Sequence, residues 1–244
     1  MPDYTYLDVA KMIDHSLLNP TLTIEDLRLG CAIARDYDAA SVCILPYALP
    51  LAVAMLAGSD VKPSTTIGFP HGGHTTAIKL AEARQALADG GLELDMVVNI
   101  SKVLSGDWDY VSNEIGALVD VSHAAGARVK VIFENCYLQD EHKIRLCEIS
   151  SEKNADWVKT STGYGTGGAT HDDLKLMRRH AAPHVQVKAA GGVRELDALL
   201  AVRALGVTRS GATRTAAMLD EARERLGLEP IVSSGVSQAA PAGY

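Results

Sequence analysis

Short apolar runs alternate with longer amphipathic segments along the whole chain. The runs predict strands at residues 12–15, 39–44, 65–69, 94–100, 129–133, 158–160, 185–189 and 207–211. A helical pattern follows each one, at residues 23–37, from 46 onward, 76–89, 108–125, 140–154, 170–180, 195–205 and 213–226. Successive strands are about 30 residues apart, which is the size of one strand–helix unit.

Eight such units predict an α/β protein of the (β/α)8 TIM-barrel class. A doubly wound open sheet usually has fewer units and a glycine-rich dinucleotide turn after its first strand, which this chain lacks. We therefore expect one catalytic barrel domain over residues 1–231, with a short N-terminal extension. Residues 232–244 are rich in Ser, Gly, Ala and Pro, and we expect them to form a flexible C-terminal tail.

Composition narrows the possible partners and the cellular compartment. The 244 residues are 47% hydrophobic and 22% charged, with a formal net charge of −7 and no basic run, which argues against nucleic-acid binding. Neither a membrane-spanning apolar segment nor a signal peptide is recognisable, so we expect no membrane association. Cys31, Cys43, Cys136 and Cys147 have no paired or zinc-type spacing, which indicates reduced thiols in a cytoplasmic protein. The histidines likewise form no metal-binding motif, so we expect no metal.

Three predicted strands carry lysines at equivalent places, in Val129-Lys130, Val158-Lys159 and Val187-Lys188. Barrel strands are covered by helices outside and packed inside, so such lysines must reach a carboxylate or line the mouth of the barrel. Asp95 is an acid inside the apolar fourth strand. A purely structural layer of Lys–Asp pairs is one interpretation, but several lysines and few strand acids would leave excess buried positive charge.

Schiff-base chemistry would use this arrangement. The pKa of an ordinary lysine is about 10.4, so at neutral pH it is too protonated to attack a carbonyl. Burial and a second ammonium group both lower that pKa, and Lys188 on the next strand would do this for Lys159. The protonated imine then acts as an electron sink. Asp95 is the candidate acid–base residue that moves protons, through water, to and from the reacting hydroxyl.

Glycine-rich turns follow the last three strands. They contain Gly163 to Gly168, Gly191-Gly192, and the run from Ser210 to Arg214 that opens the last helix. Backbone N–H groups in such turns and at helix N-termini bind phosphate, and barrels often place phosphate at this edge. Three turns on consecutive strands are better evidence for a phosphate site than one alone.

Together these residues resemble the deoxyribose-phosphate aldolase family along nearly the whole chain. The matching segments are Asp14 to Leu18, Ser41-Val42-Cys43, Ile67 to Pro70, Glu93 to Val97, Lys130 to Glu134, Val158 to Gly163 and Lys188 to Val193. The resemblance implies that Lys159 forms the Schiff base, that Lys188 lowers its pKa and that Asp95 relays protons. The implied substrate and phosphate contacts are Asp14, Thr160, Thr162, Gly163, Gly191, Gly192, Gly211, Thr213 and Arg214.

The chain departs from the family pattern in the phosphate region. Ala189 stands where a proline is frequent, Tyr164 where some relatives have a phosphate-binding lysine, and Thr213-Arg214 where Ser-Ser or Ser-Ala is frequent. These changes bear on the preference for phosphorylated substrate more than on imine chemistry. Some family members end in a tyrosine that assists proton transfer, so Tyr244 is a further catalytic candidate.

The sequence therefore predicts a class I aldolase that reversibly cleaves 2-deoxy-D-ribose 5-phosphate to D-glyceraldehyde 3-phosphate and acetaldehyde. Its partners would be sugar-phosphate and aldehyde substrates, with no cofactor, and the family suggests a homodimer. Three alternatives remain open. They are a lysine-dependent aldolase with another donor or an unphosphorylated acceptor, a non-catalytic phosphate-binding barrel, and a sugar-phosphate isomerase, which would favour paired carboxylates over paired lysines.

Overall fold

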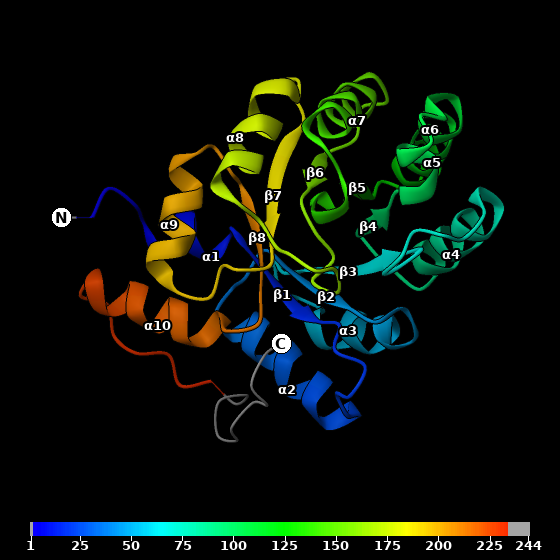
Figure 1. Cartoon of the computed structure of the whole chain (residues 1–244). Helices are drawn as coiled ribbons and strands as arrows, with labels where there is room; N and C mark the ends of the chain where they lie inside the picture. The colour runs from blue at the N-terminus through cyan, green and yellow to red at the C-terminus, as the bar shows by residue number, and fades with distance from the viewer. Residues whose placement is uncertain (1, 234–244) are drawn as a thin grey trace.

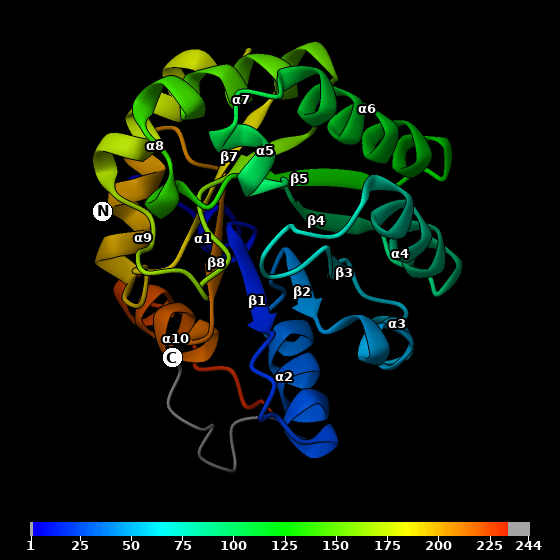
Figure 2. The ribbon, with the colours of Figure 1, turned by 45° about the vertical axis from the view of Figure 1, so that its right-hand side comes forward.

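The computed structural model describes residues 2–233, and these form a closed barrel of parallel strands in the order β1 to β8 (Figures 1 and 2). The first strand pairs with the last, through Asp14 opposite Gly211, and this pairing closes the sheet. The strands are β1 (Ile13–Leu17), β2 (Ser41–Ile44), β3 (Lys62–Ile67), β4 (Glu93–Val97), β5 (Arg128–Ile132), β6 (Trp157–Lys159), β7 (Gln186–Ala190) and β8 (Arg209–Ala212).

Helices surround this sheet, and Figure 2 shows them as an outer ring. They are α1 (Tyr6–Ala10), α2 (Ile24–Asp36), α3 (Leu49–Leu56), α4 (Thr76–Ala88), α5 (Ile100–Leu104), α6 (Trp108–Ala124), α7 (Asp140–Glu152), α8 (His171–His180), α9 (Leu196–Ala204) and α10 (Thr215–Arg225). Two 3-10 turns, η1 (Pro46–Ala48) and η2 (Asn135–Tyr137), follow β2 and β5. No helix within residues 2–233 is long and apolar enough to cross a membrane.

The predicted barrel is confirmed, and the errors lie at the ends of elements. The fourth strand was expected to reach Ile100 but ends at Val97, because the side chain of Asn99 accepts a hydrogen bond from the Lys102 N–H and starts α5. The short helices α1 and α5 were not predicted, since five residues give too little periodicity. Most of the predicted flexible tail, including Tyr244, lies outside the described residues, so that prediction and the single-domain boundary stay untested.

The two faces of the sheet differ sharply in polarity. Apolar strand residues such as Val129, Val158 and Val187 are fully buried against the helices. The intervening positions Lys130, Lys159 and Lys188 point into the barrel, because side chains alternate across a strand. This alternation places the charged residues inside and leaves the continuous hydrophobic core between sheet and helices.

Candidate active site

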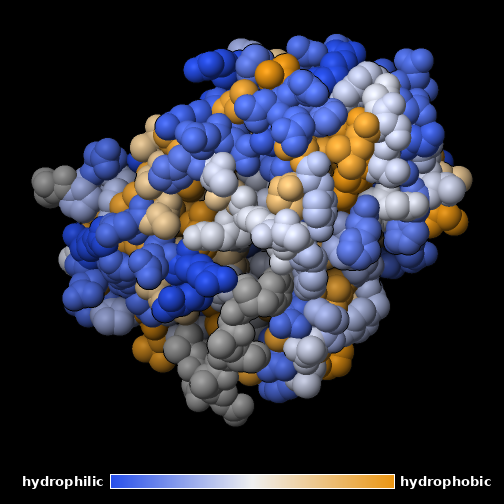
Figure 3. All heavy atoms as spheres, in the orientation of Figure 1, coloured by the Kyte–Doolittle hydropathy of each residue, from blue (hydrophilic) through white to orange (hydrophobic). Residues whose placement is uncertain are grey.

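A cavity of about 230 Å³ opens at the carboxyl ends of the strands. Lys159, Lys188, Asp14 and Cys43 line its depth, and the turns after β6, β7 and β8 form its wall. Figure 3 shows residues of intermediate hydropathy around a hollow near the middle of the visible face, as expected for a mouth bordered by glycine and threonine. The cavity thus joins the predicted lysines to the predicted phosphate turns.

Lys159 and Lys188 are direct neighbours across β6 and β7. Their ammonium nitrogens contact the same oxygen, Oδ2 of Asp95, at 2.7 Å and 2.8 Å respectively. Both side chains are almost completely buried, with exposed fractions of 3% and 1%. Two cations that share one oxygen lie within the range, about 4–6 Å, over which one charge shifts the pKa of another.

The two lysines differ in the direction of their pKa shifts. Burial, which opposes charge, lowers the pKa of Lys159, and the neighbouring ammonium of Lys188 acts in the same direction. Burial also acts on Lys188, but the carboxylates of Asp14 and Asp95 together outweigh it and raise its pKa. Lys188 contacts Asp14 Oδ2 at 2.5 Å, and no such contact is formed by Lys159. Lys159 is therefore the better nucleophile of the pair.

The charged side chains at the bottom of the cavity and beneath it form a closed ring of alternating sign, which we call the charge ring. Its members are joined by ion pairs in the order Asp95, Lys188, Asp14, Arg209, Glu93, Lys130 and back to Asp95. Within it, Lys130 lies 2.6 Å from Glu93 and 2.8 Å from Asp95. Arg209 lies 2.8 Å from Glu93 and pairs with Asp14 as well.

The charge ring contains three carboxylates and three cations, so it balances itself, and Lys159 is an additional base attached to it through Asp95. Burial opposes ionisation of Asp95, but the surrounding Lys130, Lys159 and Lys188 hold its pKa well below the usual range. Arg209, Lys130 and Lys188 do the same for Asp14. Of the lysines in this layer, the one without a carboxylate of its own in the ring is Lys159, so its ammonium form is the least stabilised of the three.

The glycine-rich loop after β6 is held from two sides. Glu134, at the end of β5, is buried in a left-handed backbone conformation (φ 60°), and its carboxylate accepts hydrogen bonds from the backbone N–H and hydroxyl of Thr162. The Tyr164 hydroxyl donates to the Leu18 carbonyl at 2.6 Å, and the Tyr164 ring packs edge-on against Phe69. The loop is thus tied to β5 on one side and to the loops after β1 and β3 on the other.

The loops after β6 and β7 also touch each other through glycine. A Cβ on Gly168 would lie 2.8 Å from the Gly191 carbonyl carbon, and Gly191 has a φ of +78°. The Ala169 N–H donates to the carbonyls of Ala190 and Gly191. Only glycine permits this approach. It leaves backbone at the cavity wall, which is the surface that phosphate prefers.

The structure brings together most of the residues predicted for the site. Besides Lys159 and Lys188, the cavity is lined by Asp14, Thr162, Gly163, Gly191, Gly192, Gly211 and Thr213. Asp95 lies just beneath, in contact with both lysines. Besides Asp95, two predicted residues within the described chain, Thr160 and Arg214, do not line the cavity. The Thr160 hydroxyl bridges the backbone N–H and carbonyl of Ala190, and Arg214 is exposed in front of α10.

Sequence reasoning missed several residues of this region. Arg194 lines the cavity beside Gly192 and adds positive charge near the glycine turns. Glu93 and Arg209 complete the charge ring. Both could have been recognised in the sequence. Glu93 lies two residues before Asp95, and Arg209 lies two residues before Gly211, so each shares a strand face with a residue already predicted for the site. Glu134 gave no such signal, since its role depends on a loop distant in sequence.

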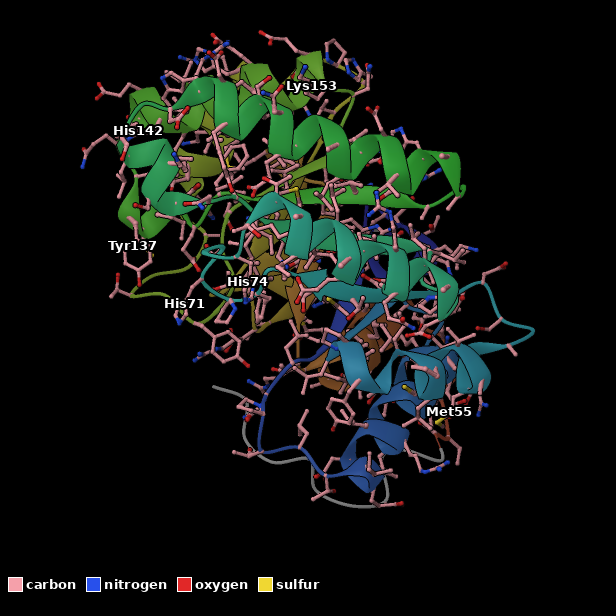
Figure 4. All side chains as sticks on the ribbon, turned by 90° about the vertical axis from the view of Figure 1, so that its right-hand side faces the viewer. Met55, His71, His74, Tyr137, His142 and Lys153 are labelled. Carbon is pink, nitrogen blue, oxygen red and sulfur yellow. The ribbon has the colours of Figure 1, made fainter. Side chains whose placement is uncertain are left out.

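Other reactive side chains at this end of the barrel include the exposed histidines of one loop and the thiol of Cys43 in the cavity. Figure 4 labels His71 and His74, in the loop after β3, and Tyr137, in η2, on the side of the molecule where the strands end. Both histidines are exposed loop residues. Burial raises the pKa of the Cys43 thiol, which makes it a poor nucleophile. Within residues 2–233 no cluster of His, Cys, Asp and Glu has the arrangement of a metal site.

Comparison with known proteins identifies the family. Residues 8–227 match the model of the DeoC/LacD family aldolases. The chain belongs to this family. It is 69% identical over 231 residues to the deoxyribose-phosphate aldolase of Rhodopirellula baltica, covering 95% of this chain and 96% of that protein.

More distant relatives share this similarity. The deoxyribose-phosphate aldolase of Thermococcus gammatolerans is 47% identical over 219 residues, covering 89% of this chain and 97% of its own. The solved structure of the tetrameric deoxyribose phosphate aldolase from Aeropyrum pernix superposes with a TM-score of 0.83 at 31% identity, covering 91% of this chain and 93% of that one. The barrel and its interior therefore belong to an aldolase.

Proposed function

We propose that this chain is a class I aldolase that reversibly cleaves 2-deoxy-D-ribose 5-phosphate to D-glyceraldehyde 3-phosphate and acetaldehyde. The observation that carries the proposal is a buried lysine with a lowered pKa, Lys159, at the base of a cavity whose wall is built from glycine turns. Similarity to the Rhodopirellula baltica enzyme supports the choice of substrate.

In this mechanism the neutral amine of Lys159 attacks C1 of the open-chain sugar, and the resulting carbinolamine takes up a proton and loses water to give a protonated imine. Removal of the proton from the C3 hydroxyl then breaks the C2–C3 bond, and its electron pair moves into the imine to give an enamine. Glyceraldehyde 3-phosphate leaves, the enamine carbon takes up a proton, and water releases acetaldehyde from Lys159. Carbon–carbon cleavage in this way needs an electron sink, which the imine supplies.

Asp95 and Lys188 would serve the proton transfers. Asp95 stays ionised beside several ammonium groups. We therefore propose that its carboxylate orients Lys159 and the water molecule that carries the proton, without remaining protonated itself. Lys188 keeps its proton, because its pKa is raised, and provides the positive charge that holds Lys159 neutral. Tyr244 remains a candidate for proton transfer at the enamine carbon and lies outside the described residues.

The phosphate would lie against the turns after β6, β7 and β8. Gly163, Gly191 and Gly192 have positive φ values and expose backbone to the cavity. Thr213 precedes α10, whose N-terminus favours an anion, and Arg194 adds a cation. These groups offset the absence of a lysine at position 164 and support a phosphorylated substrate.

Trapping the intermediate tests this function. The protein is incubated with acetaldehyde and borohydride, and the adduct is located by peptide mass spectrometry. We expect one reduced adduct, on Lys159. An adduct on another lysine, or none, contradicts the mechanism. Comparing kcat/KM for deoxyribose 5-phosphate and deoxyribose tests the phosphate assignment, and equal values would favour the alternative of an unphosphorylated substrate.

We also propose that the enzyme is a homodimer in the cytoplasm. The dimer is a family-based expectation, whereas the Aeropyrum pernix relative is described as a tetramer. Light scattering coupled to size-exclusion chromatography measures the mass directly, against 25.9 kDa for one chain. Fractionation of the producing cells tests the compartment.

A further inference from the structure

The charge ring extends from the cavity to the opposite end of the barrel. Its two deepest members, Glu93 and Arg209, are the first residues of β4 and β8, and neither lines the cavity. The Arg209 guanidinium also lies over the ring of Trp157, 4.9 Å from its centroid. Trp157 is the first residue of β6, two positions before Lys159 on the same strand face. We call this end of the barrel the floor and its two charged residues, Glu93 and Arg209, the floor pair. The charges of the floor pair therefore lie close enough to Lys159 to affect its charge state.

Every link between this floor and Lys159 is buried. Glu93 is 2% exposed, Arg209 is 9% exposed, and Lys130, Asp14 and Asp95 are inaccessible to solvent. Salt screens buried charges poorly, so a change of charge at the floor acts on Lys159 with little attenuation by solvent. The ring contributes no net charge at Lys159 while the charges of Glu93 and Arg209 balance each other, and removing one of the two alone leaves the ring charged.

We propose that the Arg209–Glu93 ion pair at the barrel floor sets the charge state of Lys159, as a pair of positioning residues that never touch the substrate. The inference rests on the proposed function, since it assumes that Lys159 must be neutral to react. Without Arg209 the ring would be negative and would hold a proton on Lys159. Without Glu93 it would be positive and would expel that proton more strongly.

Other titratable groups also surround Lys159, and none of them is substituted when the floor pair is altered. They are contributed by five further strands: Asp14 of β1, Cys43 of β2, Asp95 of β4, Lys130 of β5 and Lys188 of β7. On β3 the residue opposite Asp95 is Thr66, which carries no charge. The variants of the floor pair therefore change the charge near Lys159 without substituting any of these other groups.

The experiment measures the pH dependence of imine formation. Initial rates of reductive trapping of acetaldehyde on Lys159 are followed by intact mass from about pH 5 to 9, in the full-length protein. The acid limb of this profile is the low-pH range over which the rate rises as Lys159 loses its proton. We expect Arg209→Met to move this limb to higher pH by about one unit, and Glu93→Gln to move it to lower pH by about one unit. One unit charge at roughly 10 Å in an effective dielectric of about 20 has this effect.

Two further variants keep the test independent of folding defects. Arg209→Met combined with Glu93→Gln removes both charges and leaves the ring balanced, and Arg209→Lys retains the charge. We expect both to keep the acid limb within a few tenths of a pH unit of the unaltered protein. As a matched control, Glu114→Gln breaks a buried ion pair with Lys79 outside the ring, at 2.9 Å, and should leave the limb in place.

The outcomes separate this inference from the function on which it rests. Absence of a Lys159 adduct in the unaltered protein would contradict the proposed function. Normal trapping with the same acid limb in both single variants would overturn the inference alone. So would a shift of a full unit in the charge-balanced double variant, because geometry and not charge would then be responsible. Opposite shifts that cancel in the double variant support it.

Discussion

Tyr164 ties the glycine-rich loop after β6 to the loops after β1 and β3, and its role can be tested by removing one atom. Its hydroxyl donates to the Leu18 carbonyl at 2.6 Å, and its ring packs on Phe69 at a centroid distance of 5.3 Å. Tyr164→Phe keeps the ring and deletes the hydrogen bond. We expect a looser glycine loop, weaker phosphate binding and unchanged imine chemistry.

The magnitude follows from the burial of the acceptor. Leu18 is 3% exposed, so its carbonyl loses a partner that water cannot easily replace. Leaving a buried acceptor unsatisfied costs about 1–3 kcal/mol. The loop keeps its anchor at Glu134, so we take the lower half of that range. Since about 1.4 kcal/mol is a factor of ten, KM for deoxyribose 5-phosphate should rise about tenfold.

Steady-state kinetics with both sugars provide the assay. For Tyr164→Phe, KM should rise with deoxyribose 5-phosphate while kcat stays within about twofold. With unphosphorylated deoxyribose, kcat/KM should hardly change. Tyr47→Phe serves as the control, because Tyr47 lies in η1, is 65% exposed and does not line the cavity.

The reasoning would be refuted by equal losses of kcat/KM on both sugars. That result would mean that Tyr164 acts on the imine steps and not on the phosphate. An unchanged KM for the phosphorylated sugar would show that Glu134 and the contact with Gly191 suffice to hold the loop.

Three further predictions concern the nucleophile, its neighbour and the fold. Lys159→Met should lower the aldol cleavage rate by about 10⁴-fold or more, because the covalent route is lost, with thermal unfolding as the check that the barrel survives. Lys188→Met removes a cation that lowers the pKa of Lys159 and leaves the charge ring with one carboxylate in excess, so that pKa rises. The acid limb of kcat/KM should therefore move to higher pH by about two units, and no movement would argue against the tuning role. Gly72→Ala should lower the free energy of unfolding by about 3 kcal/mol or more, since φ is +67° and a Cβ would lie 1.9 Å from the Val98 carbonyl oxygen. Gly73→Ala is the neighbouring control, with nothing within 4 Å of its Cβ, and should change the denaturation midpoint little.

The sequence alone determined the barrel and the chemical identity of the site. Strand and helix periods are local properties of the chain, so eight units could be recognised without any contact information. Lysine inside an apolar strand is equally a local signal, because no face of a barrel strand solvates it. These two observations placed Lys159, Lys188 and Asp95 together before any distance was known.

Tertiary structure supplied the electrostatic reason for proposing Lys159 as the reactive lysine, and it showed how the glycine turns are held. Lys130, Lys159 and Lys188 occupy similar Val-Lys pairs, and only the pairing of carboxylates across distant strands leaves Lys159 as the extra base. Glu134 likewise meets Thr162 across 28 positions of sequence. Electrostatic and loop contacts depend on distances in space, whereas periodicity depends on positions along the chain. The sequence therefore predicts where charge lies, and the closed sheet determines which charge is left unbalanced.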